Sequence, residues 1–236
     1  MDAAAPTRTP LTRERIAVAA LDLVDREGLE ALSMRKLGAA LGVEAMSLYN
    51  HVQNKDDLLD ALSESLHQEI LKSYTPAANS SWRERATTMA FAYWQMAREH
   101  PNAFAIIGER PVASPAGIAV LGHCVRLFTD AGFDERRAGL MFNTAAAWVV
   151  GSINQELILM RELRQGKGFV AADVPPELSF LPAFKEECMA IDPVERFSVG
   201  LEVLLAGIEA QLDPVVPASA SADRRAYDSS THSKGE

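Results

Sequence analysis

The sequence is poor in cysteine, in long apolar runs and in positive charge. Its 236 residues include two cysteines, Cys124 and Cys188, a usage typical of a reducing compartment. Two buried thiols are the favoured interpretation, and a redox pair is the alternative. No apolar run approaches the ~20 residues that span a bilayer, and residues 1–10 lack the apolar core of a secretory signal. These absences predict a cytoplasmic protein without a membrane partner.

The common motifs of catalytic and cofactor sites are also missing. The chain has no HExxH, GxSxG, P-loop or GxGxxG motif, and no cysteine–histidine metal spacing. His123 and Cys124 are adjacent, but neighbouring residues on a helix point about 100° apart and make a poor ligand pair. The sequence therefore predicts no enzyme, no cofactor and no metal.

The net charge of −9 predicts weak non-specific attraction to nucleic-acid phosphates. Residues 1–57 carry seven Lys/Arg against nine Asp/Glu, and the remainder carries sixteen against twenty-three. Binding to DNA therefore needs a local positive face, with the acidic body turned away. Candidates for that face are Arg13, Arg15, Arg35, Lys36 and Lys55.

Helical periodicity is present along almost the whole chain. Apolar residues recur at spacings of three and four, and strand-like alternation is absent. The expected fold class is all-α, with about nine to ten helices. Caps, glycines and prolines predict helices at 12–27, 33–41, from 44, 54–73, 81–100, 101–108, 115–131, 134–164, 182–190 and 192–212.

Composition and the helix boundaries predict the domain organisation. We expect a disordered arm, a domain of short helices, a larger helical domain that opens with a connecting helix (56–73), and a disordered tail. A loop is expected at 165–181. The four parts are residues 1–10, 11–55, 56–212 and 213–236.

The most informative stretch is Ser33–Lys55. Gly42 follows an apolar-periodic run, where a left-handed helix C-cap is least costly, and a short helix restarts at Glu44. Gly38 lies where crossing helices leave no room for a bulky side chain. Two helices joined by a tight glycine turn can project the second helix into the DNA major groove, although an ordinary helical corner gives the same pattern.

With its flanks, this stretch resembles the N-terminal domain of the tetracycline-repressor (TetR) family. The segments that carry the likeness are LTRERIAVAALDLVDREGLEALSMRKLGAALGV and SLYNHVQNKDDLLDAL. Later segments resemble the ligand-binding domain of the tetracycline-repressor branch: GERP (108–111), FTDAGF (128–133), GSINQEL (151–157) and GLEVLLAGIEAQL (200–212).

The resemblance spans about residues 10–212. It implies that residues 11–55 are a helix-turn-helix DNA-binding domain and that residues 56–212 are a ligand-binding and dimerisation domain. It also implies a homodimeric repressor that binds a palindromic DNA operator and releases it when a small molecule binds. Two alternatives remain at this point. One is a helical ligand-binding or interaction module without specific DNA readout, and the other is an activator on the same scaffold.

The resemblance also implies roles for individual residues. In the family, the residue at Arg35 commonly reads a base, and those at Ser47, Tyr49, His51 and Lys55 commonly hold phosphates. The alternative role is packing for Tyr49 and a helix-end hydrogen bond for His51.

The remaining DNA-contact candidates follow from side-chain chemistry. Asn50 can make a bidentate contact with adenine, and Ala45 or Met46 can touch a thymine methyl group. The tetracycline repressor has glutamine and proline at the positions of Ala45 and Met46, so its operator sequence should not be transferred. The candidate DNA-binding residues are Arg35, Ala45, Met46, Ser47, Tyr49, Asn50, His51 and Lys55.

Methionine and aromatic residues are frequent in the middle of the chain. At helical spacing they are more often core than pocket, but in a family whose central domain binds a small molecule they indicate an apolar or aromatic effector. The candidate ligand-binding residues are Met89, Tyr93, Trp94, Phe104, Ile107, Arg110, Met141, Trp148 and Gln155.

Tetracycline repressors hold a drug–magnesium chelate through residues that differ here. Their chelating histidine aligns with Ile106, and a glutamate supplied by the partner subunit aligns with Gln155. We therefore expect no binding of tetracycline with magnesium.

The helices expected at 134–164 and 192–212 have wide apolar faces. These faces serve either the chain's own core or the four-helix dimer interface that the family forms. A two-fold dimer would place its recognition helices one DNA turn apart, ~34–36 Å, or a multiple of it, which predicts a palindromic operator. The candidate interface residues are Trp148, Ile153, Leu157, Val203, Leu204 and Ile208.

Overall fold

The computed structural model describes residues 10–164 and 175–212. Within these ranges the chain has ten α-helices, two short 3-10 helices and no β-strand, which confirms the all-α class. None of these helices is both long enough and apolar enough to cross a membrane. Most of the expected arm and of the 165–181 loop, and the whole expected tail, lie outside the described residues.

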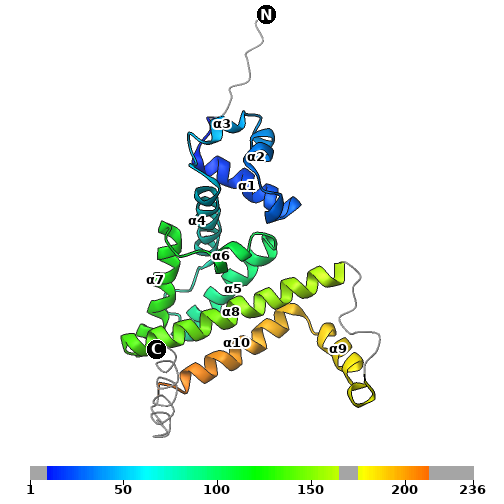
Figure 1. Ribbon diagram of the computed structural model, residues 1–236. Helices are drawn as coiled ribbons and strands as arrows, with labels where there is room; N and C mark the ends of the chain where they lie inside the picture. The colour runs from blue at the N-terminus through cyan, green and yellow to red at the C-terminus, as the bar shows by residue number, and fades with distance from the viewer. Residues whose placement is uncertain (1–9, 165–174, 213–236) are drawn as a thin grey trace, which may run out of the picture.

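The N-terminal head is a compact group of short helices at one end of the molecule (Figure 1). Thr12 and Ser33 cap its first two α-helices, because each side-chain oxygen accepts a hydrogen bond from a first-turn backbone N–H. Leu37 and Leu48 are fully buried and join the helices through a common core. The elements are α1 (Arg13–Glu27), η1 (Leu29–Ala31), α2 (Met34–Leu41) and α3 (Ala45–Leu48).

The turn between α2 and α3 requires two glycines for different reasons. Gly42 has φ 67° and ψ 34°, and its N–H donates to the carbonyls at the end of α2. Gly38 is required by the lack of space, since a Cβ there would lie 2.9 Å from the Val43 carbonyl oxygen and 3.2 Å from Ala45 N. The structure therefore confirms the predicted pair of helices joined by a glycine turn, although α3 is only four residues long.

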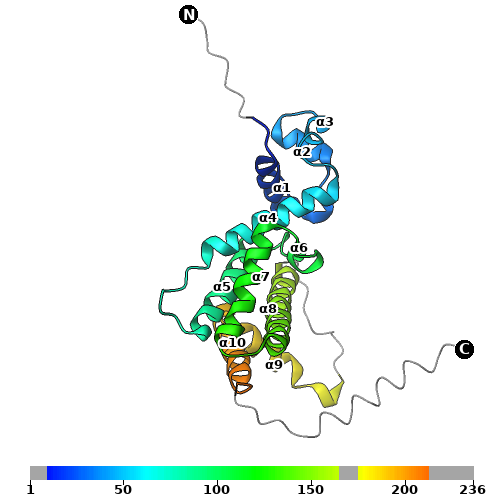
Figure 2. The ribbon, with the colours of Figure 1, turned by 90° about the vertical axis from the view of Figure 1, so that its left-hand side faces the viewer.

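One long helix, α4 (Lys55–Ser73), leaves the head and enters the body, where it packs against α5, α6 and α7 (Figures 1 and 2). The predicted caps Asn54, Ser81, Ser114, Asp134 and Asp192 all accept backbone hydrogen bonds. The remaining elements are α5 (Trp82–Glu99), α6 (Ala105–Glu109), α7 (Pro115–Asp130), α8 (Glu135–Arg164), η2 (Pro176–Leu178), α9 (Leu181–Ala190) and α10 (Pro193–Glu209).

The helix after Pro101 begins later than expected. Phe104 and Ala103 donate their N–H groups to the carbonyl of His100, which makes 101–104 a tight turn, so α6 starts at Ala105. The last helix ends at Glu209, slightly before the expected position.

A polar contact joins the head to the body. His100, at the end of α5, lies with Nδ1 2.6 Å from Asp25 Oδ2 of α1 and with Nε2 2.8 Å from Glu69 Oε2 of α4. The hydrogen bond to Asp25 raises the pKa of His100 above its ordinary value. Asn102 Nδ2 donates to the Asp25 carbonyl at 2.9 Å. The orientation of the head is therefore coupled to α4 and α5.

A buried carboxylate joins α8 to α5. Glu156 accepts hydrogen bonds from Trp94 Nε1 and from an Arg98 guanidinium nitrogen, both at 2.9 Å.

We expect Glu156→Ala to lower the free energy of unfolding by about 1–3 kcal/mol, because both donors lose their acceptor. Urea denaturation followed by circular dichroism measures the change. Gln155→Ala is the matched control, because Gln155 is exposed and should tolerate the change. Equal stability of the two variants would contradict this account.

Candidate DNA-binding surface and ligand cavity

The DNA-contact candidates lie on the first turn of α2, on α3, on the segment after it and on the first residue of α4; these parts of the head are called the tip (Figure 1). The side chain of Met46 is 74% exposed and that of Tyr49 is 44% exposed. Arg35, Asn50, His51 and Lys55 are exposed as well, whereas Ala45 and Ser47 are half-buried. Leu48 and Val52 face inward and anchor α3. The tip therefore presents polar and apolar side chains on a fixed backbone.

Two of the cations expected on a positive face have carboxylate partners within the head. Arg13 binds Asp57 at 2.5 Å and also donates to the carbonyl of His51, and its hydrogen bond holds the pKa of Asp57 below its ordinary value. Lys36 binds Glu27 at 2.6 Å. Arg13 therefore also holds the segment between α3 and α4, and both cations are half-exposed members of surface ion pairs.

The body contains a partly open, mainly apolar cavity of about 200 Å³. It lies among α4, α5, α6, α7, α8 and α10, so every long helix of the body contributes to its wall. The lining includes His67, Ala90, Phe128, Phe142, Ala146, Val149 and Leu201, and it includes the sequence candidates Met89, Tyr93 and Ile107.

The other ligand candidates lie elsewhere. Phe104 is buried in the core, and Met141 packs against that core. Trp94 and Trp148 both pack on Phe197, and a Cβ on Gly200 would overlap the Trp148 indole. These side chains make contacts between helices and do not line this cavity, and Trp148 also lines the second hollow described below.

Arg110 does not line the cavity either, because its side chain forms ion pairs on α4. Its guanidinium lies 2.6 Å from Asp60 and 3.5 Å from Asp56, both on α4. It therefore ties the corner between α6 and α7 to the connecting helix.

The sequence interpretation missed His67, the polar group of the cavity wall. His67 is buried, and its Nδ1 lies 2.7 Å from the carbonyl of Ser63. Burial lowers the pKa of His67 below its ordinary value, so the neutral ring donates through Nδ1 and Nε2 carries a lone pair. The available signal was its register, because His67 lies on the same helix face as Ile70.

The cysteines remain free. Cys124 borders the cavity, and burial raises the pKa of its thiol to about 12. Cys188 is half-buried on α9. Cys124 is therefore an unreactive thiol, in line with the favoured interpretation.

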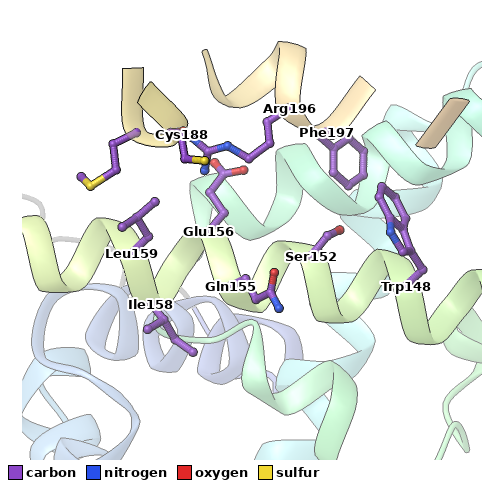
Figure 3. A pocket seen from close by; sticks show the side chains of 10 residues that line it. Trp148, Ser152, Gln155, Glu156, Ile158, Leu159, Cys188, Arg196 and Phe197 are labelled. Atoms are coloured by element: carbon purple, nitrogen blue, oxygen red, sulfur yellow. Dashed lines mark hydrogen bonds between the residues drawn. The ribbon is translucent and has the colours of Figure 1, made fainter. Parts of the chain in front are cut away.

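A second hollow, of about 600 Å³, opens between α8, α9 and α10. Figure 3 shows Trp148 and Phe197 at one end, with Arg196 and Cys188 nearer to Glu156. Gln155 lies in this hollow and not in the mainly apolar cavity.

Comparison with known proteins places the two parts of the chain in one family. Residues 16–62 match the model described as "Bacterial regulatory proteins, tetR family", and residues 75–212 match "Tetracyclin repressor-like, C-terminal domain". The second match alone covers more than half of the chain. The chain belongs to the TetR family.

Individual relatives of this TetR-family regulator align along most of their length. An HTH-type transcriptional regulator of Saccharopolyspora erythraea is 30% identical over 214 residues, which cover 86% of this chain and 87% of the relative. The structure of Streptomyces coelicolor ActR in complex with actinorhodin is 27% identical, with a TM-score of 0.69, and covers 87% of this chain and 100% of that one. A TetR variant of Acinetobacter baumannii in complex with minocycline is 25% identical, with a TM-score of 0.71 and coverage of 89% and 99%.

The apolar faces of α8 and α10 in this TetR-family chain divide into two groups. Ile153 and Ile208 are 1% and 3% exposed, so they belong to the chain's own core and offer no surface to a partner. The interface prediction is corrected for both. Leu157 and Leu204 are half-buried, whereas Val203 is 70% exposed. Further exposed apolar side chains on the two helices are Leu140, Ile158, Leu163, Val194 and Val199.

Proposed function

We propose that this TetR-family regulator is a homodimeric repressor that holds a palindromic operator and releases it when an apolar or aromatic small molecule enters the body cavity. The observation that carries the proposal is the double role of α4. The helix begins in the head beside α3, and further along its length it contributes His67 to the cavity wall. The related ActR and TetR proteins form complexes with actinorhodin and minocycline, which supports a small-molecule effector.

Contacts along α4 supply the route from ligand to DNA. Arg110 holds the α6–α7 corner to the first turns of α4, and Glu64 accepts a hydrogen bond at 2.9 Å from Ala116 N at the start of α7. Ile107 of α6 lines the cavity. A ligand that displaces Ile107 therefore moves α4 and the attached head. A preference of ~1–3 kcal/mol for the moved state weakens DNA binding ~5–150-fold.

The size of the cavity constrains the ligand. Drug-sized molecules usually need about 300–1,000 Å³, whereas the volume of this cavity is about 200 Å³. A ligand of that size must widen the cavity, and this requirement links its binding to helix movement. Ile106, which stands where tetracycline repressors have their chelating histidine, is buried in the core. This placement supports an effector other than tetracycline with magnesium.

The DNA contacts divide into base readout and phosphate binding. We expect Asn50→Ala or Arg35→Ala to cost ~1–3 kcal/mol and to relax specificity at one base position. Lys55→Ala should weaken all sequences alike and reduce the salt dependence of binding. Mobility shifts on an operator set with single base changes separate the two effects. An equal loss on every sequence for Asn50→Ala would remove Asn50 from the readout.

The dimer surface is proposed on the exposed faces of α8 and α10. We expect Val203→Glu to weaken self-association at least ~10-fold, because a buried unpaired charge costs more than the ~1.4 kcal/mol that a factor of ten requires. Sedimentation equilibrium measures the change. Val18→Glu is the matched control, since Val18 is 63% exposed on the head. A monomeric wild type, or equal effects of the two variants, would rule this surface out.

One experiment separates this function from its alternatives. Duplexes of random sequence are selected on the full-length protein, and compounds are then screened for release of the selected DNA. Enrichment of a palindrome and its release by an apolar compound support the proposal. A helical module without DNA readout enriches nothing, and an activator raises transcription from the selected site in a reporter assay. Tetracycline with Mg²⁺ belongs in the screen as a compound expected to be inactive.

A further inference from the structure

The contact between head and body contains more acidic groups than its cation can neutralise. Asp25, Glu69 and Glu99 surround His100, and they come from α1, α4 and α5. The neighbouring guanidinium of Arg98 is directed to Glu156 and lies over the ring of Trp94. The cluster therefore lacks positive charge even when His100 is protonated.

The carboxylates of this cluster are incompletely partnered. Asp25 Oδ1 is buried without a donor among the described residues, which is costly for a carboxylate oxygen. Glu69 Oε2 is 2.8 Å from His100 Nε2, and its charge and hydrogen bond are among the contacts that raise the pKa of His100. A bound cation would take the place of the proton between Glu69 and His100 and would supply the positive charge that the cluster lacks.

The ligand atoms are close enough for a single ion. One atom each from Glu69, Glu99 and His100 lie within 4.8 Å of one another. Gln95 Nε2 donates to Glu99 Oε1 at 3.0 Å and orients that carboxylate. Asp25 Oδ2 lies 2.6 Å from His100 Nδ1. A histidine that binds metal through one nitrogen commonly donates from the other to a carboxylate, and Asp25 supplies that second partner.

We propose that Glu69, Glu99 and His100 form a binding site for a divalent transition-metal cation, oriented by Asp25. One imidazole with two carboxylates suits Zn²⁺ or Mn²⁺, and three protein ligands leave a coordination position for water. The sequence motifs gave no sign of this site because its ligands come from two segments far apart in the chain. Since the ion would bridge α4 and the end of α5, with Asp25 of α1 attached through His100, it would fix the head against the body. The site does not depend on the function proposed above.

Isothermal titration calorimetry tests the proposal. The full-length protein is first treated with EDTA and is then titrated with Zn²⁺. We expect one Zn²⁺ per chain, loss of this binding in His100→Gln and Glu99→Gln, and binding weakened about 10–100-fold in Asp25→Asn. His123→Gln is the matched control, because His123 is exposed and its ring lies against Tyr74, away from the cluster.

Thermal unfolding of each variant without metal checks that it folds, and Glu99→Gln is the safest in this respect because Glu99 is exposed. A wild type that binds no Zn²⁺ overturns the proposal. Undiminished binding by folded Glu99→Gln and His100→Gln overturns it equally. A parallel titration with Mn²⁺ ranks the two ions at the same site.

Discussion

Replacing Gly38 by alanine is expected to abolish sequence-specific DNA binding while the body of the protein stays folded. The added Cβ would meet Val43 O at 2.9 Å and Ala45 Cα and N at 3.2 Å. These are backbone atoms of the turn and of the first residue of α3, so no side-chain rotation relieves the overlap. Overpacking of this kind costs about 1–3 kcal/mol. It also shifts α3 relative to α2, and the base-reading side chains depend on that relative position.

The measurement is a mobility shift on the selected operator, together with thermal unfolding. We expect at least ~100-fold weaker DNA binding, which corresponds to about 2.7 kcal/mol. Gly122→Ala is the matched control, because Gly122 is an exposed helical glycine and an added methyl group there would meet no atom within 4 Å. That change should stabilise α7 slightly. Normal operator binding by Gly38→Ala would show that the α2–α3 crossing does not position the DNA contacts.

Filling the body cavity is expected to produce a repressor that no longer responds to its effector. Ala146 of α8 lines the cavity, and leucine at this position adds three heavy atoms to a cavity of about 200 Å³. The ligand must then displace a side chain as well as widen the cavity. We expect the concentration of the screened effector that releases half of the DNA to rise at least ~10-fold, or about 1.4 kcal/mol.

Operator affinity without ligand is the internal control for this variant, because Ala146 lies far along the chain from every DNA-contact candidate. Ala119→Leu is the matched substitution, since Ala119 is exposed on α7. It should leave both the effector response and the operator affinity unchanged. An Ala146→Leu protein that responds like the wild type would place the effector outside the cavity.

Helix boundaries were predictable because their signals are local. Thr12, Ser33 and Asn54 cap helices through bonds to residues three positions away, and Gly42 ends a helix through its own backbone angles. Such interactions depend only on nearby sequence. The all-α class follows from the same signals.

The cavity lining was only partly predictable. Periodicity identified Met89, Tyr93 and Ile107 as inward-facing, but it did the same for Phe104 and Trp94, which pack in the core or against Phe197. Periodicity marks the buried side of each helix and does not say whether the opposite wall is a side chain or a space. That distinction depends on how separate helices cross.

Interface residues raise the same difficulty on α8 and α10. Ile153 and Val203 both lie on apolar helix faces, yet the first is buried in the chain and the second is exposed. A helix with apolar residues around most of its circumference can pack on its own chain and on another. Sequence alone cannot divide that circumference between the two.

The shortness of α3 has a consequence for how such proteins diversify. Only Leu48 of its four residues is buried, whereas Met46 extends into solvent. Exchanging exposed residues of α3 therefore costs the fold little, and under the proposed function it would redirect the protein to other operator sequences. The cavity wall shares no residue with this tip, so the input and the output of the regulator are free to evolve, or to be engineered, as separate modules.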